Sequence, residues 1–388
     1  MKITRIEAIP VNVPLKPGMT TKTSHGVHAT SPYVIVRIHT DDGHIGLGEA
    51  TVAPRWSGET SLGSIAIIEG LFAPLLVGED PREVTRLRGL LESAIRLNPF
   101  TKAAVEMALW DLSGKAAGVP VYQLLGGKVR DLMPIRMVVG SIDVAGAVEL
   151  AKSFLDRGVK CLKVKVGLDP QQDIERVRAV RELAGPDIPI SVDANCGWTV
   201  SQATETLQRL RQFNILFAEQ PIATGDPSEL AALRRRTEIP LMADESAFTP
   251  GDVWTLSTHR AVDIISVYPG KNGGICGTVE CVHAAKAAGL PCAMGSNLEL
   301  GVGTAAMLHL GAALPTIASE HFPGDFIGPL YHQVDLLKTP LQLGPAAATA
   351  PNGPGLGVEL DEAQLEQYRD HSKVARATGS TTTITFEG

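Results

Sequence analysis

The sequence predicts an α/β fold, a (β/α) barrel of the TIM type, joined to an α+β domain. The main observation is a set of six charged residues, each at the end of an apolar run, that recur at intervals of 25 to 28 residues. They are Lys165, Asp193, Glu219, Asp244, Lys271 and Glu299. A strand, a helix and two loops need about that many residues, so each interval predicts one βα unit. In such a barrel the strand ends meet at one mouth, where active sites lie.

The residue pattern of the first part of the chain, residues 1–125, predicts a separate α+β domain. Three strand-like runs come first, at residues 4–13, 33–40 and 44–50. From residue 64 to about 117, small and apolar residues recur at helical spacing, and Gly118 is placed to end the last helix. Strands followed by helices are typical of an α+β domain and not of the start of a barrel.

We expect residues 126–320 to form the barrel itself. Eight short runs are rich in Val, Ile and Leu, as is typical of parallel strands buried on both faces. They cover residues 134–139, 160–166, 188–193, 214–219, 239–243, 262–267, 291–295 and 315–319. Caps mark the helices between them: Thr199 and Gln202 predict a capping box, and Asp226 precedes Pro227 at a first helical position.

The last segment, residues 321–388, is rich in Pro and Gly and has one short helical stretch at 361–370. We expect it to return to the amino-terminal domain. The final TTTITF run is either an edge strand or a frayed tail, and the sequence leaves both open.

Composition excludes several classes of partner. The 388 residues carry a net charge of −7 without a basic stripe, so nucleic acid is not expected to bind. The first residues lack the apolar region typical of a signal peptide, and the sequence has no run of 18 apolar residues, so we expect no membrane partner and a cytoplasmic location. Five cysteines without C-x-x-C spacing predict reduced thiols, rather than disulfides or a zinc site.

Two lysines share the second predicted strand, in the run VKCLKVKVG. Lys163 and Lys165 are two residues apart and therefore point to the same face. Burial and like charge both lower the pKa of a lysine, which makes it a usable base near neutral pH. The alternative is a surface strand with two solvated lysines, which the flanking Val and Leu residues disfavour.

Three carboxylates end three consecutive strands. Asp193 ends PISVDAN, Glu219 ends ILFAEQP and Asp244 ends IPLMADES. They repel one another at the barrel mouth unless a hard cation lies between them, and all-oxygen ligation suits Mg²⁺, or Mn²⁺. The alternative is that they cap the following helices, which is weaker for three acids in consecutive units than for one.

Two further charged residues lie on the far side of the mouth. Lys271, in SVYPGKNGG, faces Lys165 across the barrel, so a substrate between them would meet a basic group on each side. The alternative is a solvated loop lysine, since glycines suit any turn. Glu299, in MGSNLELG, could accept a hydrogen bond, donate a proton or cap the helix that starts near Gly301.

Taken together, these residues resemble the enolase superfamily, in its muconate lactonizing enzyme (muconate cycloisomerase) subgroup. The resemblance rests on Lys-Val-Lys, Asp, Glu, Asp-Glu and Lys on strands two to six, and it covers essentially the whole chain. Residues 46–50 (GLGEA) and 54–60 (PRWSGET) are similar to that family's capping domain, and residues 328–330 and 354–357 match its return segment. The α+β domain is then expected to cap the barrel.

The resemblance implies a shared first step. Mg²⁺ on the three carboxylates holds a substrate carboxylate, and the carbanion beside it is stabilised as an enediolate. Lys165 is the acid or base on one face, Lys163 assists it, and Lys271 is the acid, base or stabilising cation on the other. Asn195 helps position the carboxylate or a metal-bound water, and Glu299 matches a proton donor or substrate hydrogen-bonding group.

Two departures narrow the choice within the superfamily. Mandelate racemases use a His–Asp pair where this chain has Lys271, and Glu299 stands where their histidine is expected. Dipeptide epimerases carry Asp-x-Asp after the eighth strand, whereas HFPGDF here contains one aspartate, Asp325. Both reactions therefore rank low.

The loop at residues 16–29 is expected to close over the mouth and select the substrate. Its His25 and His28, with Arg55, could bind a second substrate carboxylate, and solvated loop residues are an equal alternative.

The sequence thus predicts Mg²⁺-dependent chemistry on a small-molecule carboxylate, with muconate cycloisomerase-type lactonisation as the leading reaction. The alternative reaction is racemisation or epimerisation of an N-substituted amino acid, with Lys165 and Lys271 as the two bases. A non-catalytic barrel that only binds a carboxylate is disfavoured by the complete set of ligands and bases. A homo-oligomer is expected.

Overall fold

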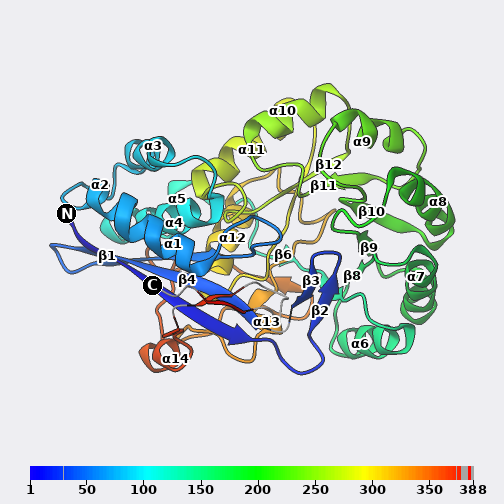
Figure 1. Ribbon diagram of the computed structural model, residues 1–388, viewed down its shortest axis with the longest axis horizontal. Helices are drawn as coiled ribbons and strands as arrows, with labels where there is room; N and C mark the ends of the chain where they lie inside the picture. The colour runs from blue at the N-terminus through cyan, green and yellow to red at the C-terminus, as the bar shows by residue number, and fades with distance from the viewer. Residues whose placement is uncertain (29, 373, 377–382, 386–388) are drawn as a thin grey trace.

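A parallel sheet curves around the centre of the barrel domain in the computed structural model, which describes residues 1–28, 30–372, 374–376 and 383–385 (Figure 1). Its seven strands lie side by side in chain order. They are β7 (Met137–Val139), β8 (Leu162–Lys165), β9 (Ile190–Asp193), β10 (Ile215–Glu219), β11 (Leu241–Ala243), β12 (Ile264–Val267) and β13 (Cys292–Met294). The prediction of a (β/α) barrel is confirmed.

The eighth predicted strand, at 315–319, is wrong as a regular strand. In this run only Ile317 forms a parallel bridge, with Cys292. The backbone then turns away from the sheet, because Ala318 O accepts hydrogen bonds from His321 N and Phe322 N. Pro315 has no N–H group to donate, and the N–H groups of Ile317 and Ser319 bond within the segment itself. Ala318 N still donates to β13, at Cys292 O. A bridge between Ile135 and Gly324 then closes the barrel, so the eighth position is filled by irregular chain.

Helices cover the outside of the sheet. They are α6 (Val144–Asp156), α7 (Pro170–Ala184), α8 (Val200–Leu210), α9 (Pro227–Arg234), α10 (Pro250–Thr258), α11 (Ile275–Ala287) and α12 (Gly301–Ala313). The predicted caps are confirmed: Thr199 and Gln202 form a capping box, and the Asp226 side chain accepts a bond from Ser228 N. Every residue of α12 is buried.

The amino-terminal domain is an antiparallel sheet, β1 (Ile3–Pro14), β4 (Thr30–Thr40) and β5 (Ile45–Thr51), packed on helices. The helices are α1 (Ser61–Ile67), η1 (Ile68–Phe72), α2 (Ala73–Leu76), α3 (Val84–Ala94), α4 (Pro99–Ala117) and α5 (Val121–Leu124). Gly118 ends α4 in the left-handed conformation, as predicted. At Gly48 a Cβ atom would lie 1.7 Å from Ala104 O, so only glycine lets α4 approach β5 this closely.

The expected loop at 16–29 contains a small hairpin, β2 (Thr21–Thr23) and β3 (Gly26–His28), which we call the lid hairpin. In Figure 1 it stands beside β8, over the strand ends of the barrel.

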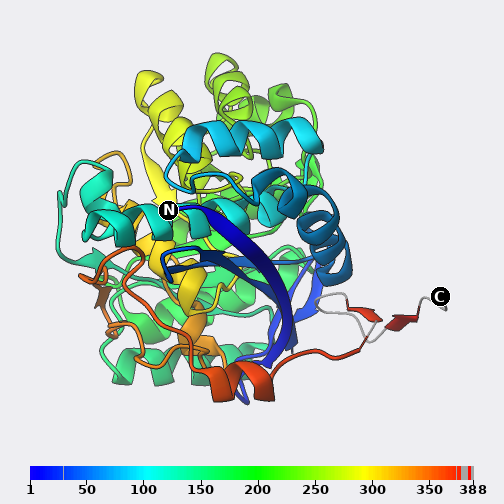
Figure 2. The same ribbon diagram turned by 90° about the vertical axis from the view of Figure 1, so that its left-hand side faces the viewer.

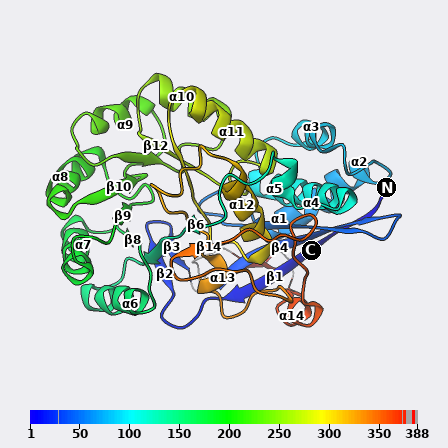
Figure 3. The same cartoon turned by 180° about the vertical axis from the view of Figure 1, so that it is seen from behind.

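The carboxyl-terminal segment runs back along both parts of the molecule. Its elements are α13 (Gly328–Tyr331), β14 (Ala347–Ala348), α14 (Glu362–Gln367), β15 (Val374–Arg376) and β16 (Thr383–Thr385). Strand β14 pairs with β6 (Met133–Pro134), visible together in Figure 3, and β15 pairs with β16. Figure 2 shows β1 crossing the molecule, with the orange and red return segment below it. The other residues of the TTTITF run lie outside the described part of the chain.

The helices in the described ranges are all too short or too polar to cross a membrane.

Candidate active site

A cavity of about 70 Å³ lies where the barrel strands end beneath the lid hairpin. The barrel contributes Lys163, Lys165, Asp193, Asn195, Glu219, Asp244 and Asp325 to its wall. The capping domain contributes Thr23, His25, Arg55 and Trp56, and the segment after β13 contributes Ser296, Asn297 and Leu298. The sequence-predicted residues therefore meet at one place, apart from Lys271 and Glu299, which are not in this wall.

The three predicted metal ligands are buried at the ends of adjacent strands. Asp193 and Glu219 are the last residues of β9 and β10 and are directly paired in the sheet, while Asp244 follows β11. The nitrogen of Lys163 lies 3.3 Å from both the Asp193 and the Glu219 carboxylate. Because parallel strands end at one edge, the three acids reach the same cavity at similar heights.

These acids influence one another strongly. Burial and the nearby Asp193 carboxylate raise the pKa of Glu219 to about 8. Burial also raises the pKa of Asp193, but the ammonium groups of Lys165 and Lys163 outweigh it and lower that pKa to about 2. Additional positive charge beside such a buried acid would stabilise its ionised form. An all-oxygen set of three carboxylates is the donor set that Mg²⁺ and Mn²⁺ prefer, so these residues fit a hard divalent cation.

Lys163 belongs to a buried network that the sequence did not predict. Its ammonium lies 2.6 Å from the carboxylate of Asp325, which also forms an ion pair of 2.7 Å with Arg136. Arg136 in turn lies 3.4 Å from Glu219. Burial lowers the pKa of Lys163, but Asp325 and Glu219 more than compensate and raise it above its ordinary value. The expected lowering of this lysine's pKa is therefore wrong.

Arg136 and Asp325 are buried charged residues of this site that the sequence analysis does not predict. The available signal for Arg136 was a charged residue inside the apolar run of the first barrel strand. In the sequence, Asp325 stands out only as a departure from the Asp-x-Asp pattern. Its signal was weak, because it follows irregular chain and not a strand.

Lys165 points into the cavity from the end of β8. It donates to Asp193 Oδ2 at 2.5 Å and to Asn195 Oδ1 at 2.7 Å. Asn195 has a positive φ of 43° and donates its side-chain amide to Glu245 at 3.0 Å. Asn195 therefore orients Lys165, and its own hydrogen bond to Glu245 keeps Asn195 in position.

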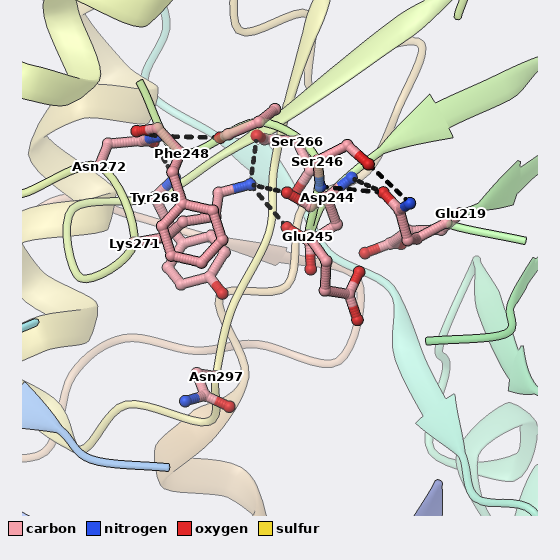
Figure 4. Close-up of polar contacts among 12 residues, drawn as sticks. Glu219, Asp244, Glu245, Ser246, Phe248, Ser266, Tyr268, Lys271, Asn272 and Asn297 are labelled. Carbon is pink, nitrogen blue, oxygen red and sulfur yellow. Dashed lines mark hydrogen bonds and ion pairs between the residues drawn. The ribbon is translucent and has the colours of Figure 1, made fainter. Parts of the chain in front are cut away.

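Lys271 is completely buried, which rules out the alternative of a solvated loop lysine. Its ammonium donates to Asp244 Oδ1 at 2.7 Å, to Asp244 O at 3.0 Å and to Ser266 O at 2.7 Å (Figure 4). It follows β12, whereas Lys165 ends β8, and the strands that carry the three acids lie between them. The two lysines thus flank the carboxylates from opposite sides.

Glu299 does not reach the cavity. Its carboxylate accepts bonds from the Ser296 hydroxyl at 2.5 Å and from Asn297 N at 3.0 Å. It does not cap α12 either, because the amides of Leu300 and Gly303 are bonded by Glu49 of the capping domain instead. Glu299 thus shapes the segment that presents Ser296 and Asn297, and in this structure it is placed for neither proton transfer nor capping.

The lid residues lie at the outer wall of the cavity. His25 Nε2 lies 3.1 Å from Glu245 Oε1, and Arg55 donates to the backbone oxygen of His25 at 3.3 Å. Arg55 is exposed and not paired with a carboxylate by any contact among the described residues. The side chain of His28 lies outside the part that the structure describes.

Comparison with known proteins shows which family the chain belongs to. Residues 4–126 match the mandelate racemase / muconate lactonizing enzyme N-terminal domain, and residues 146–364 match the enolase C-terminal domain-like family. Muconate cycloisomerase 1 of Acinetobacter baylyi is 34% identical over 372 residues, 94% of this chain and 99% of that protein. N-succinyl-L-Arg/Lys racemase of Bacillus cereus is 31% identical over 382 residues, 97% of this chain and 100% of that protein.

A solved structure extends the comparison to a metal-bound relative. The dipeptide epimerase from Cytophaga hutchinsonii, complexed with Mg and the dipeptide D-Ala-L-Val, superposes with a TM-score of 0.90 at 31% identity. The alignment covers 95% of this chain and 99% of that one. These relatives perform different reactions at similar identity. The chain belongs to the enolase superfamily, among the muconate cycloisomerase-like enzymes, and is an enzyme of the isomerase or lyase class.

Proposed function

We propose that the protein holds Mg²⁺ or Mn²⁺ on Asp193, Glu219 and Asp244 and moves a proton at the carbon beside a substrate carboxylate. The observation that carries this proposal is the placement of Lys165 and Lys271 on opposite sides of the three buried acids. When bound, the cation supplies a fixed positive charge that holds the substrate carboxylate and offsets negative charge developing beside it. Lys163, Asn195 and the Arg136–Asp325 pair then keep the acids and Lys165 in position.

The specific reaction we propose is lactonisation of a muconate-type dicarboxylate. One carboxylate oxygen adds to a carbon–carbon double bond, and the carbanion formed beside the other carboxylate takes a proton from the Lys165 ammonium. The proposal is supported by the 34% identity to a muconate cycloisomerase and by Arg55, an exposed cation in the cavity wall suited to a second carboxylate.

A second candidate is racemisation of an N-substituted amino acid. One lysine amine would remove the α-proton from one face, and the ammonium of the other lysine would return a proton to the opposite face. The paired lysines favour this candidate, because lactonisation needs proton delivery on one face only. The relative that acts on N-succinyl amino acids supports it as well.

The test is a substrate panel in deuterated water with Mg²⁺ present. cis,cis-Muconate is followed by loss of its ultraviolet absorbance, and N-succinyl amino acids are followed by α-deuteration and by optical rotation. Lactonisation predicts muconate turnover with one deuterium incorporated and no exchange in the amino acids. Racemisation predicts the reverse pattern. A protein that gives neither signal with either class would contradict both candidates.

Two variants assign the lysines. Lys165→Ala should abolish turnover of either substrate class. Lys271→Ala should abolish racemisation but leave a measurable rate of lactonisation. Lys160→Ala is the matched control, because Lys160 is an exposed lysine on the approach to the same strand and should keep normal activity.

A further inference from the structure

A mixed cluster of donor atoms lies beside the carboxylate site, at the junction of lid and barrel. It consists of His25 from the lid hairpin, Cys196 after β9 and Glu245 after β11. Within the described residues, one nitrogen, one sulfur and one carboxylate oxygen of this group all lie within 4.8 Å of one another. Three different segments supply these donors, so no spacing in the sequence could have indicated the cluster.

The second observation is an unsatisfied atom in the same cluster. Glu245 is only 8% exposed, and its Oε1 accepts bonds from His25 and from Asn195. Its Oε2 is buried and has no hydrogen-bond partner among the described residues. Leaving a buried carboxylate oxygen without a partner costs free energy, and a cation would remove that cost.

The donor set indicates which cation would fit. Nitrogen, sulfur and oxygen together are typical of Zn²⁺, whereas Mg²⁺ takes oxygen ligands. Zinc–ligand bonds of about 2.0–2.3 Å place tetrahedral ligand atoms about 3.3–3.6 Å apart. His25 Nε2 and Glu245 Oε1 lie 3.1 Å apart, which is already close to this separation. Three protein ligands would leave the fourth position open, as in many zinc sites.

We propose that His25, Cys196 and Glu245 form a second, zinc-type cation site that ties the lid hairpin to the barrel. The site is distinct from the three-carboxylate site in its residues and in its ligand chemistry. An ion there would join the lid to the loops after β9 and β11, and so hold the cavity closed. Burial beside Glu245 raises the pKa of the Cys196 thiol, so the bound ion would replace a proton on sulfur. The sequence-based expectation of five simple reduced thiols would then not hold for Cys196.

The test uses Co²⁺ as a spectroscopic substitute for Zn²⁺, added to full-length protein saturated with Mg²⁺ under reducing conditions. A cobalt ion bound to a thiolate gives a charge-transfer absorption, which Co²⁺ at a site of carboxylates alone cannot give. We expect this band to saturate with one equivalent in the wild type and in Cys276→Ser, and to be absent in Cys196→Ser. Cys276 is the matched control because it too is a free, half-buried cysteine, on α11. No band in the wild type, or a full band in Cys196→Ser, would overturn the proposal.

His25→Asn tests the connection to the lid. It should weaken cobalt binding at least about tenfold while the band keeps its thiolate character. Unchanged affinity would overturn the proposal, since the lid would then not take part. If Cys196→Ser fails to fold by circular dichroism, Cys196→Ala and His25→Asn decide the question by the same readout. Zn²⁺ should displace Co²⁺ and abolish the band, because a tetrahedral site with nitrogen and sulfur ligands is the kind that Zn²⁺ prefers.

Discussion

The Lys163 ammonium lies 2.6 Å from the Asp325 carboxylate, deep in the wall of the cavity. Asp325 follows Gly324, whose backbone closes the barrel, so this ion pair joins the second strand to the closing segment. Arg136 donates to the same Asp325 oxygen at 2.8 Å, lies 2.7 Å from the other oxygen and also approaches Glu219. One buried acid thus positions two cations and, through them, a proposed metal ligand.

Replacing Asp325 by Asn should destabilise the protein strongly. The change keeps the shape of the side chain but leaves Lys163 and Arg136 buried without their shared counter-charge. We expect the free energy of unfolding in urea to fall by about 3–5 kcal/mol. Asp156→Asn is the control, because Asp156 pairs with Lys152 on the surface, and it should cost less than about 1 kcal/mol. Equal effects of the two changes would contradict the role assigned to Asp325.

Metal binding should stabilise the fold through Glu219. Adding Mg²⁺ at about a hundred times its dissociation constant to metal-free protein should raise the free energy of unfolding by about 2.7 kcal/mol. Chelation should reverse the change and abolish activity. Glu219→Gln should lose both the stabilisation and the activity, while Glu238→Gln, an exposed acid, should keep both. Stabilisation of Glu219→Gln by the same amount as the wild type would place the cation elsewhere.

Stability should fall in mild acid because of His309. Burial lowers the pKa of this residue to about 4, and both ring nitrogens are engaged, with Tyr122 N and Leu356 O. The unfolded chain takes up a proton near pH 6.5 and the folded chain only near pH 4. The stability contributed by neutral His309 is therefore complete above about pH 6.5 and lost as the pH falls toward 4, about 3 kcal/mol in all.

The measurement compares unfolding in urea at neutral pH and near pH 4.5. His309→Gln should flatten the pH dependence of the unfolding free energy relative to the wild type. His44→Gln, at an exposed histidine, should leave that dependence unchanged. A wild-type slope in His309→Gln would show that the imidazole titrates alike in both states.

The lid should determine affinity more than chemistry. If the substrate is a dicarboxylate, Arg55→Leu should raise KM about tenfold or more with little change in kcat, because the lost cation contacts only the remote carboxylate. The same change should leave KM for an N-succinyl amino acid nearer its original value if the tail of that substrate lies elsewhere. Arg178→Leu, an exposed arginine on α7, is the matched control. An unchanged KM for the best substrate would remove the local support for a diacid.

The sequence by itself determined the barrel and most of its mouth. Lys165, Asp193, Glu219 and Asp244 lie at or just after the ends of regular parallel strands, and the regular βα interval shows where such ends fall. Burial of these runs on both faces leaves little choice of conformation, so local pattern and tertiary structure agree.

Only the tertiary structure decided which residues meet through long-range contacts. Asp325 reaches Lys163 from irregular chain that replaces the eighth predicted strand, and Glu49 of the capping domain bonds the start of α12, where Glu299 had been a candidate. Cys196, His25 and Glu245 meet from three separate segments. Such pairings depend on how the barrel closes and how the cap sits on it. Sequence periodicity reports which face of an element is buried, and it carries no information about what lies opposite that face.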